Sequence, residues 1–182
     1  MRVVTTVVPD ESRTTHTHAR VAGWLEQLYI NTTGQSVKAG EALAGIFSQD
    51  LFATQTEYLS ALKTTRHGPQ SEIVDGAKAR LKVLGMSEHE IDDIRRSGTP
   101  HRLVTITAPH SGVVLQRGVT AGTAVDPSTT LLTVADLSRV WIWAEVPEAG
   151  ARQMTLGTVA RLEFPATGRA PEDAKIDFIY PT

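Results

Sequence analysis

GQSVKAGEAL, residues 34–43, occurs a second time as GTAVDPSTTL, residues 122–131. Glycine, valine and leucine occupy the same positions in both copies, and Gly40 of the first copy is answered by Ser128 of the second. A repeated supersecondary unit indicates a fold of two similar halves, neither of which buries its apolar face alone. The repeat therefore predicts one β domain that is split between two distant parts of the chain.

A small residue, a glycine and an apolar run precede each copy. The first copy follows AGWL, residues 22–25, and the second follows SGVVL, residues 111–115. Such apolar runs between turn-forming residues are typical of short strands joined by tight turns. Each half is therefore expected to be a set of short strands.

The insertion between the halves, residues 48–100, has a helical pattern. Ser48 is suited to cap a first helix, and His67-Gly68-Pro69 is expected to end it. One face of this helix repeats at spacings near the helical period through Leu51, Gln55, Tyr58 and Leu62.

A second and a third helix are expected in the same insertion. The apolar face of the second is formed by Ile73, Ala77, Leu81 and Leu84. Gly85 is suited to its C-terminal cap. Ser87 and Glu90 match a capping box, which predicts a short third helix with Ile91 and Ile94 on one face. The insertion thus predicts an antiparallel helical hairpin followed by one short helix.

Four further segments have strand character. Residues 3–8 are rich in valine, and alternation of apolar and polar residues marks 140–146, 160–164 and 175–180. We expect them to form an antiparallel sheet or a small, incomplete β-barrel.

Composition excludes several classes of function. The 182 residues carry a net charge of −2, so no electrostatic footprint for nucleic acid is present. Cysteine is absent, which excludes disulfides and thiolate metal sites. No apolar stretch approaches the roughly 20 residues of a membrane span. The chain reads as a soluble fragment.

The chain resembles the membrane fusion protein family, the periplasmic adaptors of RND-type tripartite efflux pumps, and most closely its heavy-metal efflux branch. The residues that carry the resemblance are VPDE (8–11), GWLEQLYINTTG (23–34), QTEYL (55–59), LGMS (84–87), APHSGVV (108–114) and FIYP (178–181).

The resemblance implies a mainly β fold with an inserted α-hairpin: a lipoyl-like barrel-sandwich hybrid domain and a partial antiparallel β-barrel domain. It divides the chain into a strand of the barrel domain (1–13), the first lipoyl-like half (14–47), the hairpin (48–100), the second half (101–135) and the rest of the barrel domain (136–182).

The resemblance also implies a function. It points to a periplasmic adaptor, with a parent protein associated with the inner membrane, that links an inner-membrane RND transporter to an outer-membrane channel as a homohexamer. The expected cargo is heavy-metal cations. Neither catalysis nor a cofactor is implied. Contact with a partner is expected at the hairpin bend, through Arg66, His67 and Gln70.

Two other functions stay open at this point. A lipoyl or biotinyl carrier domain would present one lysine on a two-residue turn between the halves. Here the insertion takes that place, so Lys38 and Lys63 are expected to be ordinary solvated lysines. An adaptor of a multidrug or type I secretion system is the other alternative, which the short hairpin disfavours.

Other chemistry-bearing residues are expected to have ordinary roles. His16 and His18 share a strand face, but two imidazoles without a third ligand make a weak site, so no metal site is expected. The acidic run Glu88, Glu90, Asp92 and Asp93 complements a helix dipole. Ser111, His110 and Asp126 lack the context of a hydrolase triad. Trp141 and Trp143 are expected to pack in the barrel or against another domain.

Overall fold

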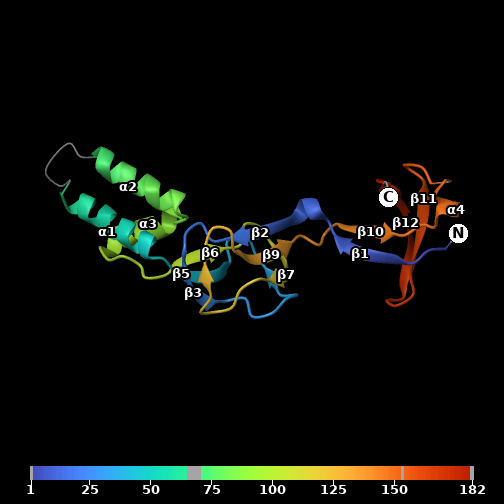
Figure 1. Ribbon diagram of the computed structural model, residues 1–182, viewed down its shortest axis with the longest axis horizontal. Helices are drawn as coiled ribbons and strands as arrows, with labels where there is room; N and C mark the ends of the chain where they lie inside the picture. Colours follow the sequence, from blue (N-terminus) through green and yellow to red (C-terminus); the bar gives the residue numbers. More distant parts are fainter. Residues whose placement is uncertain (1, 65–70, 153, 181–182) are drawn as a thin grey trace. The chain divides into compact units, whose positions relative to one another are not determined.

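Figure 1 shows the computed structural model, which describes residues 2–64, 71–152 and 154–180. The chain folds as two compact units. One is Pro9–Trp141, and the other combines Met1–Val8 with Ile142–Thr182. The larger unit holds both copies of the repeat and the whole insertion between them.

The larger unit contains two four-stranded sheets in which every pairing is antiparallel. The first sheet has the order β2-β9-β7-β4, and the second has the order β6-β5-β3-β8. The strands are β2 (Thr14–His18), β3 (Gly23–Leu28), β4 (Ser36–Val37), β5 (Ala42–Phe47), β6 (Val104–Thr107), β7 (Gly112–Arg117), β8 (Ala124–Val125) and β9 (Thr130–Ala135).

The two halves exchange strands. In the first sheet, β9 and β7 of the second half lie between β2 and β4 of the first half; in the second sheet, β5 and β3 of the first half lie between β6 and β8 of the second. Each half therefore supplies the centre of one sheet and both edges of the other. Neither half completes a sheet by itself, which confirms the interlocked, pseudo-symmetric β domain that the repeat predicts.

The hydrogen bonds repeat the symmetry between the halves. The amide of Gly34 donates to the carbonyl of Val114 at 2.8 Å, and the equivalent Gly122 donates to Leu25 at 2.7 Å. Both glycines have positive φ, +85° and +89°, which other residues rarely adopt. The glycine of each repeat copy thus turns the chain and fastens it to the other half.

A second pair of glycines allows a close approach of backbones. A Cβ on Gly23 would lie 2.1 Å from the carbonyl oxygen of Phe47, and one on Gly112 would lie 2.5 Å from that of Ala135. Any side chain at these positions would force the paired strands apart. This explains the glycine before the apolar run in each half.

The one mismatch between the repeat copies corresponds to two different turns. Gly40 has φ of +80°, whereas no described non-glycine residue, Ser128 included, has positive φ. In the second copy Asp126 accepts from the amide of Ser128 at 2.8 Å and from its hydroxyl at 2.5 Å. The side chain of Asp126 thus stabilises the turn, so a glycine is not required there.

The insertion forms the predicted hairpin and third helix: α1 (Gln49–Thr64), α2 (Ser71–Val83) and α3 (Glu88–Ser97). The Oγ of Ser48 lies 3.5 Å from the amide of Leu51, as expected of the N-cap. Gly85 has φ of +105°, and the amides of Gly85 and Met86 bond back to the carbonyls of Lys82 and Leu81. This Schellman arrangement confirms the C-cap. Gly98, with φ of +69°, ends α3.

Two hydrophobic cores hold the larger unit together. The sandwich core lies between the sheets and includes Leu25, Leu43, Val114, Leu131 and Val134, each fully buried. The second core joins the helices to the edge of the sandwich through Val21, Leu51, Tyr58, Leu81, Met86, Ile91, Ile94 and Val104. The helices are therefore packed on the sandwich and not merely tethered to it.

Two further strand pairs lie wholly or mainly in the smaller unit, with a short helix, α4 (Glu148–Ala151), between them in sequence. β1 (Thr5–Pro9) pairs with β10 (Val140–Ala144), and β11 (Val159–Phe164) pairs with β12 (Arg169–Lys175). In the described residues these sheets are not closed into a barrel. The fold is thus mainly β with an inserted α-hairpin, as predicted, and its barrel-type part is open.

One expected strand is wrong. Residues 175–180 alternate like a strand, but β12 is the more polar segment just before them, Arg169–Lys175. The reason is the turn at Gly168, with φ of +64°, which folds the chain back and pairs Phe164 with Arg169. Turn geometry, not apolar alternation, sets the register of this hairpin.

Candidate partner-binding site on the helical hairpin

The hairpin bend is the expected contact site, but Arg66, His67 and Gln70 lie outside the described residues. The helices that lead to the bend are described. At 1.5 Å per residue, the 16 residues of α1 extend about 24 Å and the 13 of α2 about 20 Å. The contacts at the base of the hairpin therefore determine where the outer ends of α1 and α2, which lead to the bend, are held.

Gln55 fixes α1 to the segment that leads into β6. Its side chain is completely buried, with 0% exposure. Its Nε2 donates to the carbonyl of His101 at 3.1 Å, and its Oε1 accepts from the amide of His101 at 2.7 Å. The side-chain amide thus satisfies both polar groups of one residue of the returning chain, as a paired strand would.

Glu90 fixes α3 to the sandwich. Its Oε2 accepts from the amide of Ser87 at 2.9 Å, while its own amide donates to the Oγ of Ser87, so the predicted capping box is confirmed. The other oxygen, Oε1, accepts from the amide of Thr105 in β6 at 2.9 Å. One carboxylate therefore closes the helix and joins it to a strand.

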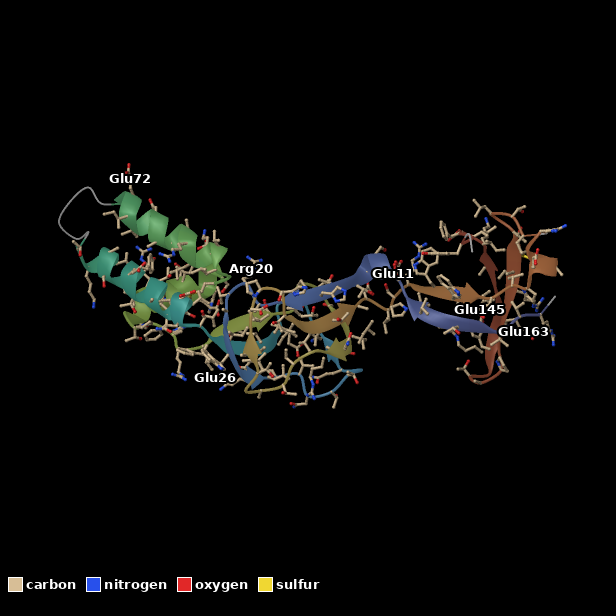
Figure 2. The ribbon with its side chains drawn as sticks, viewed as in Figure 1. Glu11, Arg20, Glu26, Glu72, Glu145 and Glu163 are labelled. Carbon is tan, nitrogen blue, oxygen red and sulfur yellow. The ribbon has the colours of Figure 1, made fainter. Side chains whose placement is uncertain are left out.

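Surface side chains strengthen the same junction. Arg102 makes two hydrogen bonds with the carboxylate of Glu26, at 2.5 and 3.3 Å, and its guanidinium lies 4.5 Å from the ring centroid of Phe47. Arg20 lies where the sandwich meets the helices (Figure 2), and a Cβ on Gly85 would lie 3.1 Å from the Cδ of Arg20. Arg102 follows the helical insertion and Phe47 precedes it, so this junction joins the two ends of the insertion.

Ion pairs link the helices to one another. Arg80 of α2 pairs with Glu57 of α1 at 3.4 Å, and Lys78 pairs with Glu88 of α3 at 3.0 Å. Lys82 also pairs with Glu88. Hydrogen bonds from Lys82 and Lys78 lower the pKa of Glu88, and the bond to Glu88 raises the pKa of Lys78. These groups are exposed or half-buried at the surface, so each pair contributes little to stability.

The acidic run of α3 has separate structural partners. Glu88 pairs with lysines, Glu90 closes the capping box, and Asp93 pairs with Arg96 and His89. The expected role of this run, which is to complement the dipole of α3, stays a prediction. Among the described residues, no group of three or more His, Asp or Glu side chains is arranged to hold a metal ion.

The three residues considered above as a hydrolase triad form hydrogen bonds with other groups and not with one another in a triad. Ser111 Oγ accepts from the amide of Ala39 at 2.9 Å, and His110 Nε2 lies 2.8 Å from the Oγ1 of Thr15. Asp126 is occupied by its own turn. Lys38 is exposed in the turn that Gly40 completes, and Lys63 is in the last turn of α1.

The two tryptophans of β10 have different neighbours. The guanidinium of Arg139 lies 5.6 Å from the ring centroid of Trp141. Nearby, Asp10 accepts hydrogen bonds from the amide and hydroxyl of Ser12. The bond from the Ser12 hydroxyl is the main reason why the pKa of Asp10 is lowered. Trp143 packs on Tyr180, with ring centroids 5.6 Å apart. Both are half exposed.

Two interlocked sheets with a helical insertion between β5 and β6 define a barrel-sandwich hybrid of the adaptor type. Residues 14–135 match the family model described as the CusB barrel-sandwich hybrid domain. The chain therefore belongs to this family of membrane fusion proteins, whose members are adaptors and not enzymes.

Curated relatives and a solved structure agree with this assignment. The chain is 29% identical over 149 residues to the cation efflux system protein CusB of Escherichia coli, which covers 79% of this chain and 36% of CusB. It is 25% identical over 197 residues to the cobalt-zinc-cadmium resistance protein CzcB of Cupriavidus metallidurans, covering 92% and 35%. The chain thus spans about a third of the length of these relatives.

The crystal structure of ZneB from Cupriavidus metallidurans has the same fold. The match has a TM-score of 0.67 at 21% identity and covers 97% of this chain and 82% of ZneB. No helix within the described residues has the length and apolar character needed to cross a membrane.

Sequence reasoning missed what Gln55 and Glu90 do beyond their own helices. Gln55 is a polar residue on an otherwise apolar helix face, and that irregularity is a signal from which a buried hydrogen bond could have been predicted. Glu90 gave only the signal of its cap. Its bond to Thr105 depends on where β6 lies, which no local pattern reveals.

Proposed function

We propose that this chain is part of a periplasmic adaptor that links an inner-membrane RND transporter to an outer-membrane channel for the efflux of heavy-metal cations. Membership of the CusB family supports the adaptor role. The names of CusB and CzcB, a cation efflux protein and a cobalt-zinc-cadmium resistance protein, support the class of cargo.

The helical insertion is the observation that carries the proposal. β5 and β6 pair directly, with Ile46 opposite Val104, so a short turn would suffice to join them. The chain instead places three helices in this connection. A projection from a small sandwich serves to reach another molecule, and it leaves no short turn on which a carrier lysine could be presented.

The anchored base suits a coupling role. Gln55 and Glu90 bond the helices to the returning chain and to β6, and the second core packs them on the sandwich. A displacement of the sandwich therefore moves α1 and α2 with it, and the helices transmit this movement toward the hairpin bend. Arg66, His67 and Gln70 are the proposed contacts with the channel.

The remaining parts of the proposal follow from the same family. We assign the chain to the periplasm, with a parent protein associated with the inner membrane, and propose a homohexamer in the complete protein. The division into barrel segments 1–13 and 136–182, lipoyl-like halves 14–47 and 101–135, and hairpin 48–100 is proposed on the same basis.

A transport assay tests the cargo and the contact together. The complete gene product is returned to cells that lack their metal efflux adaptor, and growth is measured with zinc, cobalt, copper, detergents and dyes. We expect rescue against metals only. The triple variant Arg66→Glu, His67→Ala, Gln70→Ala is expected to abolish rescue at equal protein level.

A matched variant on the same hairpin serves as the control. Glu72→Gln changes an exposed residue of α2 and should leave rescue intact. Full rescue by the triple variant would remove the bend as the contact. Rescue of growth in the presence of dyes, with no rescue in the presence of metals, would favour a multidrug adaptor instead.

A carrier domain remains the second candidate and has its own test. Intact-mass measurement after expression in a host that attaches lipoate and biotin is expected to give the unmodified mass. An added cofactor mass on Lys38 or Lys63 would overturn the adaptor proposal.

A further inference from the structure

Two histidines share the outer face of β2. His16 and His18 are both exposed, and their ring centroids lie 6.4 Å apart. Between them Thr17 points into the sandwich and is buried, as strand alternation requires. β2 is the edge strand of its sheet, so solvent reaches the pair from the side as well.

The neighbouring strand orients one of the rings. His16 pairs with Thr133 of β9, and its Nδ1 lies 3.1 Å from the Oγ1 of Thr133. When Nδ1 carries the proton and donates it to this hydroxyl, Nε2 presents its lone pair outward. Histidines that bind metals commonly use the other ring nitrogen in this way, which fixes the ring and its tautomer.

The separation of the rings suits a shared ion. With a metal–nitrogen bond of about 2.0–2.1 Å and a ring nitrogen about 1.1 Å from its centroid, two imidazoles on one ion have centroids roughly 4.5–5.2 Å apart at right-angled or tetrahedral geometry, and at most about 6.4 Å apart, when the ion lies on the line between them. The observed 6.4 Å is at this upper limit, so the two rings are near enough to share an ion once they turn toward each other. Small rotations of exposed side chains then bring both nitrogens to the ion.

We propose that His16 and His18 form a two-imidazole site for a divalent transition-metal cation of the copper(II), nickel(II) or zinc(II) class. Imidazole is the ligand that these ions share, and water fills the remaining positions. With only two protein ligands the ion exchanges readily. Sequence spacing alone favoured two ordinary exposed residues; the ring separation and the bond to Thr133 are what the structure adds. The site does not depend on the proposed adaptor role.

Titration of the untagged 182-residue chain with nickel(II) and copper(II) tests the site. We expect one saturable equivalent by calorimetry, and at least a tenfold loss of affinity in either His16→Gln or His18→Gln. Copper(II) paramagnetic resonance should show coupling to two nitrogens in the parent chain and to one in each variant.

His89→Gln is the matched control, because His89 is an exposed histidine on α3 that pairs with Asp93 instead. It should bind as the parent chain does. Equal affinity in all three variants, or no saturation of the parent chain below about 1 mM, a free energy of binding near −4 kcal/mol, would overturn the proposal. Unchanged unfolding transitions in the variants would confirm that any loss is not caused by misfolding.

Discussion

At the scale of single residues, Thr17 is a polar side chain at a buried position of the sandwich. Thr17 is buried in β2, and its Oγ1 has no hydrogen-bond partner within the described structure. Thr17 lies opposite Leu132, as Ile106 of the other half lies opposite Ala44. The pseudo-symmetry thus places an apolar residue at the equivalent position, and a hydroxyl at Thr17 costs free energy.

Thr17→Val is expected to stabilise the chain. Replacing the unsatisfied hydroxyl by a methyl group removes its desolvation penalty and should raise the free energy of unfolding by about 1 kcal/mol. Urea denaturation measures the change. Thr15→Val is the control on the same strand: Thr15 Oγ1 bonds to His110 at 2.8 Å, so this variant should give no gain. Equal losses in both variants would show that Thr17 does have a partner.

Asp126 should give the second turn a dependence on pH. The bond from the Ser128 hydroxyl is the main cause of its lowered pKa, followed by the Ser128 amide. A lowered folded-state pKa means that the stabilisation is complete above the unfolded value, near 3.8, and is lost as pH falls through the folded value.

The difference in unfolding free energy between the parent chain and Asp126→Ala should therefore be constant near neutral pH and shrink below pH 3.8. Ser128→Ala removes the main cause of the shift, so in that variant the pH-dependent loss should be smaller and should be complete at a higher pH. Chemical denaturation at a series of pH values measures both. A difference that stays constant down to full protonation would contradict the assigned bonds.

At the scale of elements, the helices depend on the sandwich more than on their own propensity. Caps at Ser48, Gly85, Ser87 and Gly98 define where they begin and end. Helices of 10 to 16 residues are marginal in isolation. Most of their stability therefore comes from the second core and from two side-chain clamps, which are the hydrogen bonds of Gln55 to His101 and of Glu90 to Thr105.

Gln55→Leu is expected to loosen the hairpin base. The variant leaves the amide and carbonyl of His101 without their partner, at a cost of about 2 kcal/mol. Urea denaturation and amide exchange at His101 measure the effect. Gln49→Leu, at an exposed position of the same helix, should change stability by less than about 0.5 kcal/mol. Unchanged exchange at His101 in Gln55→Leu would rule out the clamp.

At the scale of the whole molecule, the larger unit holds what it needs to fold. Its cores, both four-stranded sheets and the helices α1, α2 and α3 lie within Pro9–Trp141, and the ion pair of Arg13 with Asp136 joins its two ends. Neither half of this unit is expected to fold alone, because each sheet contains strands from both halves.

The fragment 9–141 is therefore expected to unfold cooperatively, with a midpoint within about 2 °C of the corresponding transition of the intact chain. The fragments 14–47 and 101–135 should show no cooperative transition alone. Circular dichroism during heating measures all three. Independent folding of either half would contradict the strand exchange.

Local patterns in the sequence determined much of this molecule. The repeat, the helix caps, the capping box and the apolar helix faces could be read directly, because each depends on residues close together in the chain. Family membership followed from those same stretches. The bend residues stay a prediction.

Only the tertiary structure decided the long-range pairings: the strand exchange between the halves, the choice of Arg169–Lys175 over residues 175–180, and the bonds of Gln55 and Glu90 to distant backbone. The physical reason is common to all of them. A hydrogen bond between segments far apart in sequence leaves no periodic trace in either segment. It becomes specific only when the packed core brings the two backbones together.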